Sequence, residues 1–117
     1  MEDQNVIDQD TFAQLKELMG ADFITELIDT YIGETSGLVD QLQQALTGQD
    51  AAAFGRLAHS IKSSSASLGA LVFSQQAREL EMMGKANDLS GAQAKLEKMG
   101  IDFTAVKVRL EELKNEP

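Results

Sequence analysis

The chain has 117 residues, a length that allows one hydrophobic core, and we expect a single domain over residues 1–117. It contains no cysteine, which excludes a disulfide framework, a zinc knuckle and a thiol nucleophile. Its net charge of −9 argues against nucleic acid and anionic membranes as partners, because both require a cationic surface. No basic region followed by an apolar run opens the chain and no stretch of about eighteen apolar residues occurs, so we expect a cytoplasmic protein.

Hydrophobic residues recur at helical spacing along almost the whole chain. The pattern predicts a short helix that ends near Gly20 and a long helix from about residue 22 to a break at 47–50. A third helix is expected over about 51–67, a fourth over about 70–86, and one uninterrupted last helix after residue 90. In the last helix the apolar residues alternate at intervals of four and three: Ala92, Leu96, Met99, Phe103, Val106, Leu110 and Leu113.

Polar residues near the expected helix starts suggest how the helices are capped. Thr11 and Gln14 have the spacing of a capping box, as do Ser90 and Gln93, and Asp50 is placed to cap the third helix. Four long amphipathic helices joined by short connections must run antiparallel to their neighbours. The predicted fold is therefore all-α, an antiparallel up-down-up-down four-helix bundle with a short N-terminal capping helix.

The only histidine, His59, lies in the third predicted helix. At about 100° per residue, the following residues fall within about 40° of the first of them and form the buried side: Phe54, Ala58, Ile61, Ser65 and Leu68. His59 falls about 140° away, so its ring is expected to face water. Its helical neighbours are small or basic: Gly55, Arg56, Lys62, Ser63 and Ala66. No Asp or Glu occurs from residue 51 to 78, which leaves a neutral-to-basic window in an acidic chain.

The constellations that enzymes build around histidine are missing from the sequence. His59 has no Asp or Glu at helical reach to orient it as a base, and one histidine cannot form the Glu-x-x-His pairs of a carboxylate metal bundle. We therefore expect neither an enzyme with turnover of its own nor a metal site. An exposed neutral imidazole can instead accept a phosphoryl group, and Lys62, one turn further on, can reach the negative charge that this adds.

The stretch 58–70 resembles the signature of histidine-containing phosphotransfer (HPt) domains of two-component phosphorelays. The resemblance rests on the pair His59-x-x-Lys62, the small residues that follow it, and Leu-Gly-Ala at 68–70. It extends over nearly the whole chain, from about residue 7 to 113, and implies the helical fold expected above.

The resemblance implies a role for each matching residue. His59 would accept phosphate on Nε2 from a receiver-domain aspartate and pass it to another, Lys62 would assist, and Gly69 would turn the chain between helices. Ser63 stands where the family usually has glycine, and serine is still small enough to keep the histidine accessible. Glu81 matches a position at which some members have glutamine near the histidine.

The resemblance also implies the partners. We expect a stand-alone, monomeric carrier between receiver domains of a hybrid histidine kinase and a response regulator, without a cofactor of its own, since the receiver would supply Mg²⁺. Docking would use the first helix and the exposed sides of the second and third. Residues expected to contact the partner or leave room for it are Arg56, Gly55, Ser63 and Ala66.

Simpler explanations stand beside several of these assignments. His59 could be an ordinary solvated histidine, Gly69 only a helix C-cap, and the serines after Lys62 a kinase target rather than small residues for close packing. Met82 and Met83 are expected to fill the core. The alternative function is a phosphate-independent helical adaptor that docks or sequesters a receiver domain without being modified.

Overall fold

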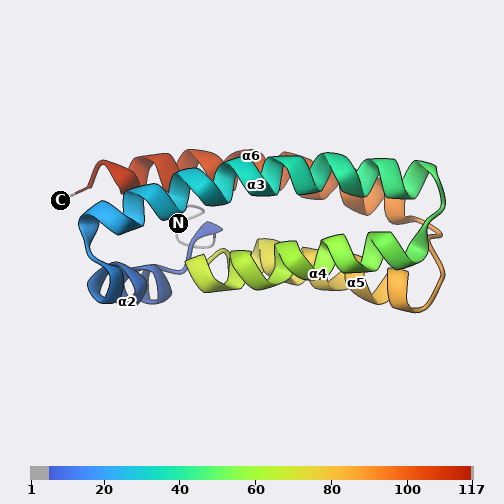
Figure 1. The fold of residues 1–117 in the computed structure, drawn as a ribbon, viewed down its shortest axis with the longest axis horizontal. Helices are drawn as coiled ribbons and strands as arrows, with labels where there is room; N and C mark the ends of the chain where they lie inside the picture. The colour runs from blue at the N-terminus through green and yellow to red at the C-terminus, as the bar shows by residue number, and fades with distance from the viewer. Residues whose placement is uncertain (1–5, 117) are drawn as a thin grey trace.

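The computed structural model describes residues 6–116, and every regular element in this range is an α-helix. The helices are α2 (Gln9–Met19), α3 (Ala21–Thr47), α4 (Ala51–Leu68), α5 (Leu71–Lys85) and α6 (Ala92–Lys114), numbered as in Figure 1. The predicted all-α class is confirmed, and α6 continues through Gly100 as the spacing of its apolar residues indicated. Within the described range, no helix has the length and apolar character needed to cross a membrane.

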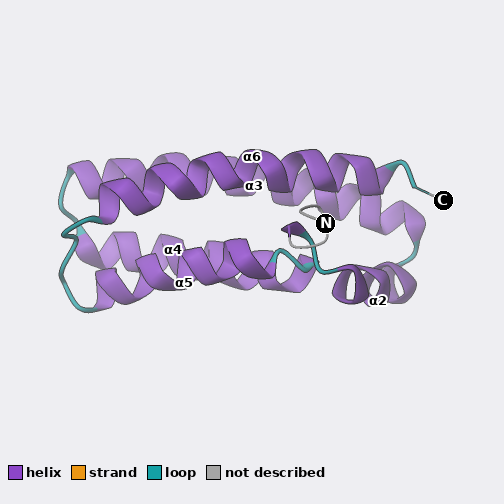
Figure 2. Cartoon of the chain, turned by 180° about the vertical axis from the view of Figure 1, so that it is seen from behind, coloured by secondary structure: helices purple, strands orange, loops and turns teal. Residues whose placement is uncertain are grey.

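The four longer helices lie side by side along the long axis of the molecule, and the short helix α2 lies at one end (Figure 1). Helices α3 and α5 each contact both α4 and α6, so every long helix packs against two others. Short loops at residues 48–50, 69–70 and 86–91 join successive long helices at alternating ends (Figure 2). This arrangement turns the apolar stripes of all four helices toward one interior.

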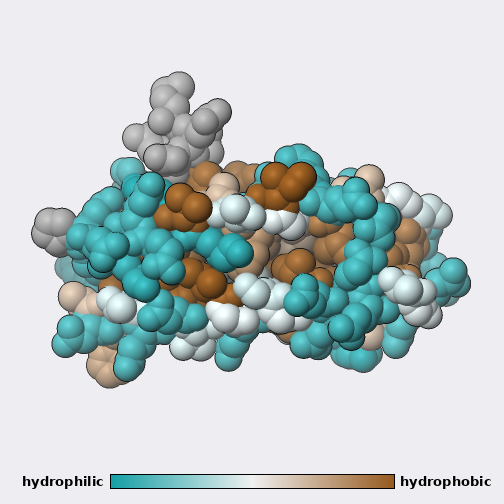
Figure 3. All heavy atoms as spheres, turned by 90° about the horizontal axis from the view of Figure 1, so that it is seen from above, coloured by the Kyte–Doolittle hydropathy of each residue, from teal (hydrophilic) through white to brown (hydrophobic). Residues whose placement is uncertain are grey.

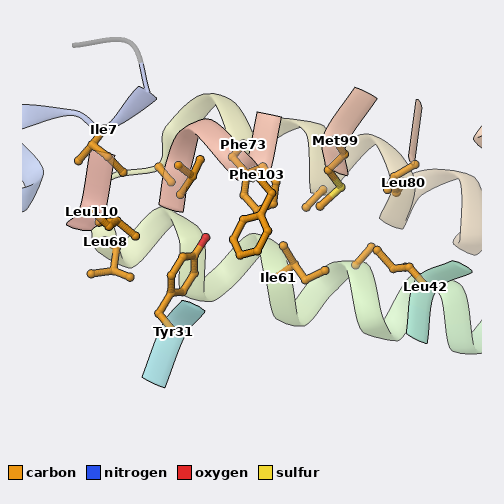
Figure 4. Packing of buried hydrophobic residues seen from close by; sticks show 14 of the residues in the cluster. Ile7, Tyr31, Leu42, Ile61, Leu68, Phe73, Leu80, Met99, Phe103 and Leu110 are labelled. Atoms are coloured by element: carbon orange, nitrogen blue, oxygen red, sulfur yellow. The ribbon is translucent and has the colours of Figure 1, made fainter. Parts of the chain in front are cut away.

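Three aromatic rings from three helices meet in this interior (Figure 4). Phe73 of α5 stacks on Phe103 of α6 with 5.3 Å between ring centroids, and Tyr31 of α3 packs edge-on against Phe103 at 6.3 Å. The Tyr31 hydroxyl and Ser65 Oγ of α4 share a hydrogen bond of 2.6 Å, and burial raises the pKa of Tyr31 to about 12. Ser65 is buried as predicted, and its hydroxyl is satisfied there by this partner.

Hydrophilic residues cover most of the face formed by α3 and α6, and hydrophobic atoms show along its middle (Figure 3). Single apolar side chains also reach the surface, among them Ile101 and Val108 of α6. Met82 of α5 is 56% exposed, which corrects the expectation that it fills the core, whereas Met83 packs against the core partly buried. Consecutive helical residues point about 100° apart, so only one of the two methionines faces the interior.

The start of α2 differs from the prediction because an aspartate caps it first. Asp8 Oδ2 accepts hydrogen bonds from Thr11 N over 3.0 Å and from Thr11 Oγ1 over 2.6 Å. Helix α2 therefore begins at Gln9, and Thr11 lies in its first turn rather than at its cap. The predicted cap of α4 is confirmed, since Asp50 Oδ1 accepts from Ala53 N over 3.1 Å.

The predicted capping box of α6 is also wrong. The cap residue is Gly91, and Ser90 N donates to Asp88 Oδ1 over 3.1 Å in the turn before it. The side chain of Gln93 does not cap the helix, because its amide nitrogen donates to Gln43 Oε1 of α3 over 2.9 Å. The side chain that the local pattern assigned to the cap of α6 instead forms a hydrogen bond to another helix.

The turn after α4 is built on Gly69, whose φ of +95° lies in the left-handed region. An added Cβ on Gly69 would lie 3.0 Å from the carbonyl oxygen of Asp8, and Asp8 N donates to Gly69 O over 2.7 Å. The end of α4 and the residue that caps α2 are therefore in direct backbone contact. A side chain at position 69 would crowd the backbone of Asp8.

Replacing Gly69 by alanine is expected to lower the free energy of unfolding by about 1–3 kcal/mol, because the left-handed backbone and the close approach of Asp8 both disfavour a Cβ. The matched control is Gly91→Ala, which has a φ of +78° but open space around the Cβ, so it should lose less. Urea denaturation of both variants measures the difference. An equal loss of unfolding free energy in both variants would show that the close approach of Asp8 does not add to the effect.

Candidate functional site

His59 lies near the middle of α4, with 58% of its side chain exposed. The residues predicted to form the buried side of this helix are all buried: Phe54, Ala58, Ile61, Ser65 and Leu68. Their burial fixes the rotation of α4 about its axis. The imidazole faces solvent, as predicted from the helical spacing.

A buried glutamate on the neighbouring helix holds the imidazole. Glu81 of α5 is 5% exposed in its side chain, and its Oε2 lies 2.7 Å from His59 Nδ1. Its Oε1 lies 2.8 Å from Lys62 Nζ, and its Oε2 also lies 3.2 Å from Lys85 Nζ. No acid lies at helical reach of His59 on α4, as the sequence indicated, but the fold supplies a carboxylate from another helix.

The surroundings of Glu81 keep its carboxylate ionised. The hydrogen bond from Lys62 has the largest influence, and the bonds from His59 and Lys85 act in the same direction, so the pKa of Glu81 falls from 4.5 to about 2 although burial raises it. An ionised carboxylate can only accept hydrogen bonds, so Nδ1 of His59 carries the proton in their contact. In the neutral ring the free lone pair therefore lies on Nε2.

The two lysines differ in how firmly they are held. Lys62, on α4 one turn after the histidine, is 29% exposed, whereas Lys85 on α5 is 72% exposed. Sequence analysis missed Lys85, although it follows Glu81 at the i,i+4 spacing of a helical ion pair, which could have indicated their contact. Nothing in the sequence of α4 points to Glu81 itself.

An open groove of about 730 Å³ runs beside His59 between α4 and α5. The residues that line it are Ala51, Ala52, Gly55, Arg56, His59, Ser60, Glu81, Gly84 and Lys85. Of the predicted docking residues, Arg56 is exposed here, and Lys85 adds a second positive charge. The groove therefore brings positive charge to the side of the histidine that faces solvent.

The remaining docking residues do not share one surface. Ser63 is exposed and Ala66 is half-buried, at one and two turns beyond His59 on α4. Gly55 is buried, because α5 packs against it through Gly84. The expectation that Gly55 leaves open space for a partner is thus corrected: it forms part of the groove's floor and a contact between helices.

Chemically, this arrangement offers a nucleophilic ring nitrogen at the surface with compensating charge around it. When Nε2 of His59 attacks an electrophile, the ring becomes positive, and the Glu81 carboxylate at Nδ1 can stabilise that charge. The ammonium groups of Lys62 and Lys85 lie 2.8 Å and 3.2 Å from the oxygens of the carboxylate that contacts the ring, so they place positive charge beside the imidazole. Residues 6–116 hold no group of three or more His, Cys, Asp or Glu side chains that could bind a metal ion.

Acid is expected to remove the stabilising effect of Glu81. Because the pKa of Glu81 in the folded protein, about 2, lies below its unfolded value of 4.5, this stability is fully present above pH 4.5 and is lost as the pH falls toward 2. Urea unfolding of wild type and Glu81→Gln should differ by about 1–3 kcal/mol at neutral pH and converge in acid. The control Glu79→Gln removes an exposed ion pair with Lys95 and should show little difference at any pH. If the difference in unfolding free energy between wild type and Glu81→Gln stays the same at low pH, the ionised carboxylate is not its source.

The sequence model of the Hpt domain family matches residues 26–116, and the chain belongs to this family. Membership places it among the histidine phosphotransfer proteins of two-component signalling. The chain is 27% identical over 85 residues to the phosphorelay protein LuxU of Vibrio harveyi, an alignment covering 73% of this chain and 75% of LuxU. Its structure is similar to the crystal structure of histidine-containing phosphotransfer protein B (HptB) from Pseudomonas aeruginosa PAO1, with a TM-score of 0.88, 28% identity, and coverage of 93% of this chain and 94% of that one.

Proposed function

We propose that this protein carries phosphoryl groups between receiver-domain aspartates through a phosphohistidine at His59. The hydrogen bond from His59 Nδ1 to the buried carboxylate of Glu81 carries the proposal, because it leaves Nε2 of an exposed ring as the nucleophile. Membership of the Hpt family supports the same role for the protein. The protein is a carrier without turnover of its own, since each cycle only moves one group from a donor to an acceptor.

In the loading step, the Nε2 lone pair attacks the phosphorus of an aspartyl phosphate on the donor receiver. The N–P bond forms as the P–O bond to the aspartate breaks, and the aspartate leaves as a carboxylate with the electron pair. Nδ1 keeps its proton, so the ring becomes positive and its bond to Glu81 strengthens. Unloading is the reverse reaction on a second receiver. Mg²⁺ would be held by the receiver rather than by this chain, and there it would supply positive charge for the phosphoryl oxygens.

Lys62 is the residue of this chain best placed to assist the transfer. Its Nζ is held 2.8 Å from Glu81 Oε1, and its side chain stays partly exposed. A flexible ammonium group can turn from the carboxylate toward a phosphoryl oxygen on Nε2 without moving the helix. Lys62 thereby stabilises both the transition state and the phosphohistidine.

The scaffold and partners complete the proposal. The described residues 6–116 form one domain, an antiparallel up-down-up-down four-helix bundle with a short N-terminal helix against one end, and the protein acts as a cytoplasmic monomer. Its partners are the receiver domains of a hybrid histidine kinase and of a response regulator. They dock on the face around His59, where Arg56 supplies charge and Ser63 and Ala66 leave room for the approach. Gly69 positions α2 beside this face through its backbone contact with Asp8.

A small-molecule donor tests the site without knowledge of the partner. Incubation with potassium phosphoramidate should form one N–P bond on Nε2 of His59, with loss of ammonia, and ³¹P NMR and peptide mapping detect it. The label should be labile in acid and stable in alkali. Phosphorylated receiver domains from the source organism then test transfer in the relay direction. A label stable in acid and mapping to serine would overturn the proposal.

Replacing Lys62 by alanine is expected to slow phosphorylation by a receiver domain about three- to tenfold and to shorten the lifetime of the phosphohistidine, because one compensating charge is lost. Rapid-quench transfer assays measure the rate. Lys95→Ala, which removes an exposed lysine of α6 paired with Glu79, is the matched control and should transfer at the wild-type rate. Equal rates for both variants would leave Lys62 without a role in transfer.

A further inference from the structure

Helices α4 and α5 approach each other most closely where two glycines meet. An added Cβ on Gly84 of α5 would lie 2.6 Å from both the Cα and the N of Gly55 on α4, and 2.8 Å from the carbonyl oxygen of Ala51. All three atoms belong to the backbone, so no side chain could rotate to make room. The reverse substitution is different: an added Cβ on Gly55 would meet the backbone of Glu81 and Gly84 at 3.6 Å, an ordinary contact distance.

This contact lies next to the histidine and its carboxylate. Gly55 precedes His59 by one helical turn, and Gly84 follows Glu81 by about one turn. The contact between the two glycines is therefore about one turn away from the contact between the imidazole and the carboxylate. The distance between the helix axes at the glycines therefore sets how far the Glu81 side chain must reach to His59 Nδ1.

We propose that Gly84 is a positioning residue for the phosphoryl transfer: by letting α5 touch the backbone of α4, it holds Glu81 within hydrogen-bond distance of Nδ1 and so keeps the lone pair on Nε2. This inference rests on the proposed function, because it concerns the reactivity of the same imidazole. It adds a residue that touches neither the histidine nor the phosphoryl group.

The distances set the size of the expected effect. To bring a Cβ on Gly84 from 2.6 Å to an ordinary contact, the helices must separate by roughly 1 Å at this point. The bond between His59 Nδ1 and Glu81 Oε2 is 2.7 Å long, and a separation of about 3.6 Å is no longer a hydrogen bond. Glu81 is buried, and its Oε2 is also paired with Lys85 of its own helix, so its side chain has little freedom to follow the ring. Without the bond, the proton is free to occupy either ring nitrogen.

The test is Gly84→Ala, read out by ¹⁵N NMR of the imidazole on the alkaline plateau of a pH series, where the ring-nitrogen shifts no longer change with pH. The chain has one histidine, so the spectrum contains one pair of ring nitrogens. In wild type the shifts should be those of a protonated Nδ1 and an unprotonated Nε2, and in Gly84→Ala they should move toward each other. Labelling by phosphoramidate should slow about tenfold. Gly100→Ala on α6, where a Cβ meets nothing within 4 Å, has the same change in helix propensity and should leave both readouts unchanged.

A second variant covers the case in which Gly84→Ala does not fold. The Cβ of Gly55→Val fits, but its two methyl groups must displace α5 from the other side of the same contact, so the same NMR change is expected, whereas Gly55→Ala should keep the wild-type shifts. Unchanged ring shifts in a folded Gly84→Ala, or in Gly55→Val if Gly84→Ala is unfolded, would overturn the inference even if wild type is labelled normally. Failure of wild type itself to become labelled on His59 would instead refute the proposed function.

Discussion

Replacing His59 by glutamine is expected to abolish phosphorylation of the protein and leave its fold intact. The side chain is 58% exposed and contributes no apolar surface to the core, and glutamine can still donate a hydrogen bond to Glu81. The free energy of unfolding should therefore change by less than about 1 kcal/mol. Labelling by phosphoramidate and by a phosphorylated receiver, together with urea denaturation, measures the two effects.

The same variant separates the carrier from the adaptor. Ser67→Ala, an exposed change on the same helix, is the control and should be labelled like wild type. Binding of a receiver domain to His59→Gln should persist, since most of the docking surface is unchanged. If relay signalling in cells survives in His59→Gln, phosphorylation is dispensable and the phosphate-independent adaptor is the correct function.

Replacing Glu81 by alanine is expected to slow phosphorylation of His59 by about ten- to a hundredfold, the second largest effect after loss of the histidine. Without the carboxylate, Nδ1 has no acceptor to fix its proton, the charge that develops on the ring is not stabilised, and Lys62 and Lys85 lose their common partner. Single-turnover labelling by a phosphorylated receiver domain gives the rate constant.

A second substitution at position 81 separates the effect of the charge from that of the hydrogen bond, and a substitution at position 79 serves as the control. Glu81→Gln keeps an oxygen that can accept from Nδ1 but carries no charge, so its rate should fall between those of alanine and wild type. Glu79→Ala removes an exposed glutamate of the same helix, paired with Lys95, and is the control. A Glu81→Ala variant that is labelled at the wild-type rate would mean that the carboxylate only stabilises the fold.

Much of the fold follows from periodicity because the core is made of long amphipathic helices. The alternating four- and three-residue intervals of the last helix mark residues that are all buried in α6. Caps were predicted less well, since several polar residues near each helix start compete for the same backbone groups. At α2 the competitor was Asp8, and at α6 the side chain of Gln93 was engaged by Gln43 across the bundle.

The exposed imidazole was predictable for the same reason, as it depends only on which residues of α4 are buried. Helical spacing could not give its partner, because the contact with Glu81 joins positions 22 residues apart, and only the family resemblance pointed to position 81. Helical spacing places Glu81 beside the buried Leu80 but does not say which helix it faces. The burial of Gly55 was missed likewise, since it results from a glycine on α5 rather than from any property of α4.

The shared carboxylate has an electrostatic consequence for the loaded carrier. With a neutral imidazole, the side chains of His59, Glu81, Lys62 and Lys85 together carry one net positive charge, in a protein whose formal net charge is −9. Because Nδ1 keeps its proton, each transferred PO₃⁻ unit adds one negative charge, and the loaded cluster becomes electroneutral. At short range a negatively charged phosphoryl group is then attracted more strongly to the empty cluster than to the loaded one. Raising the ionic strength should therefore slow loading more than it slows delivery.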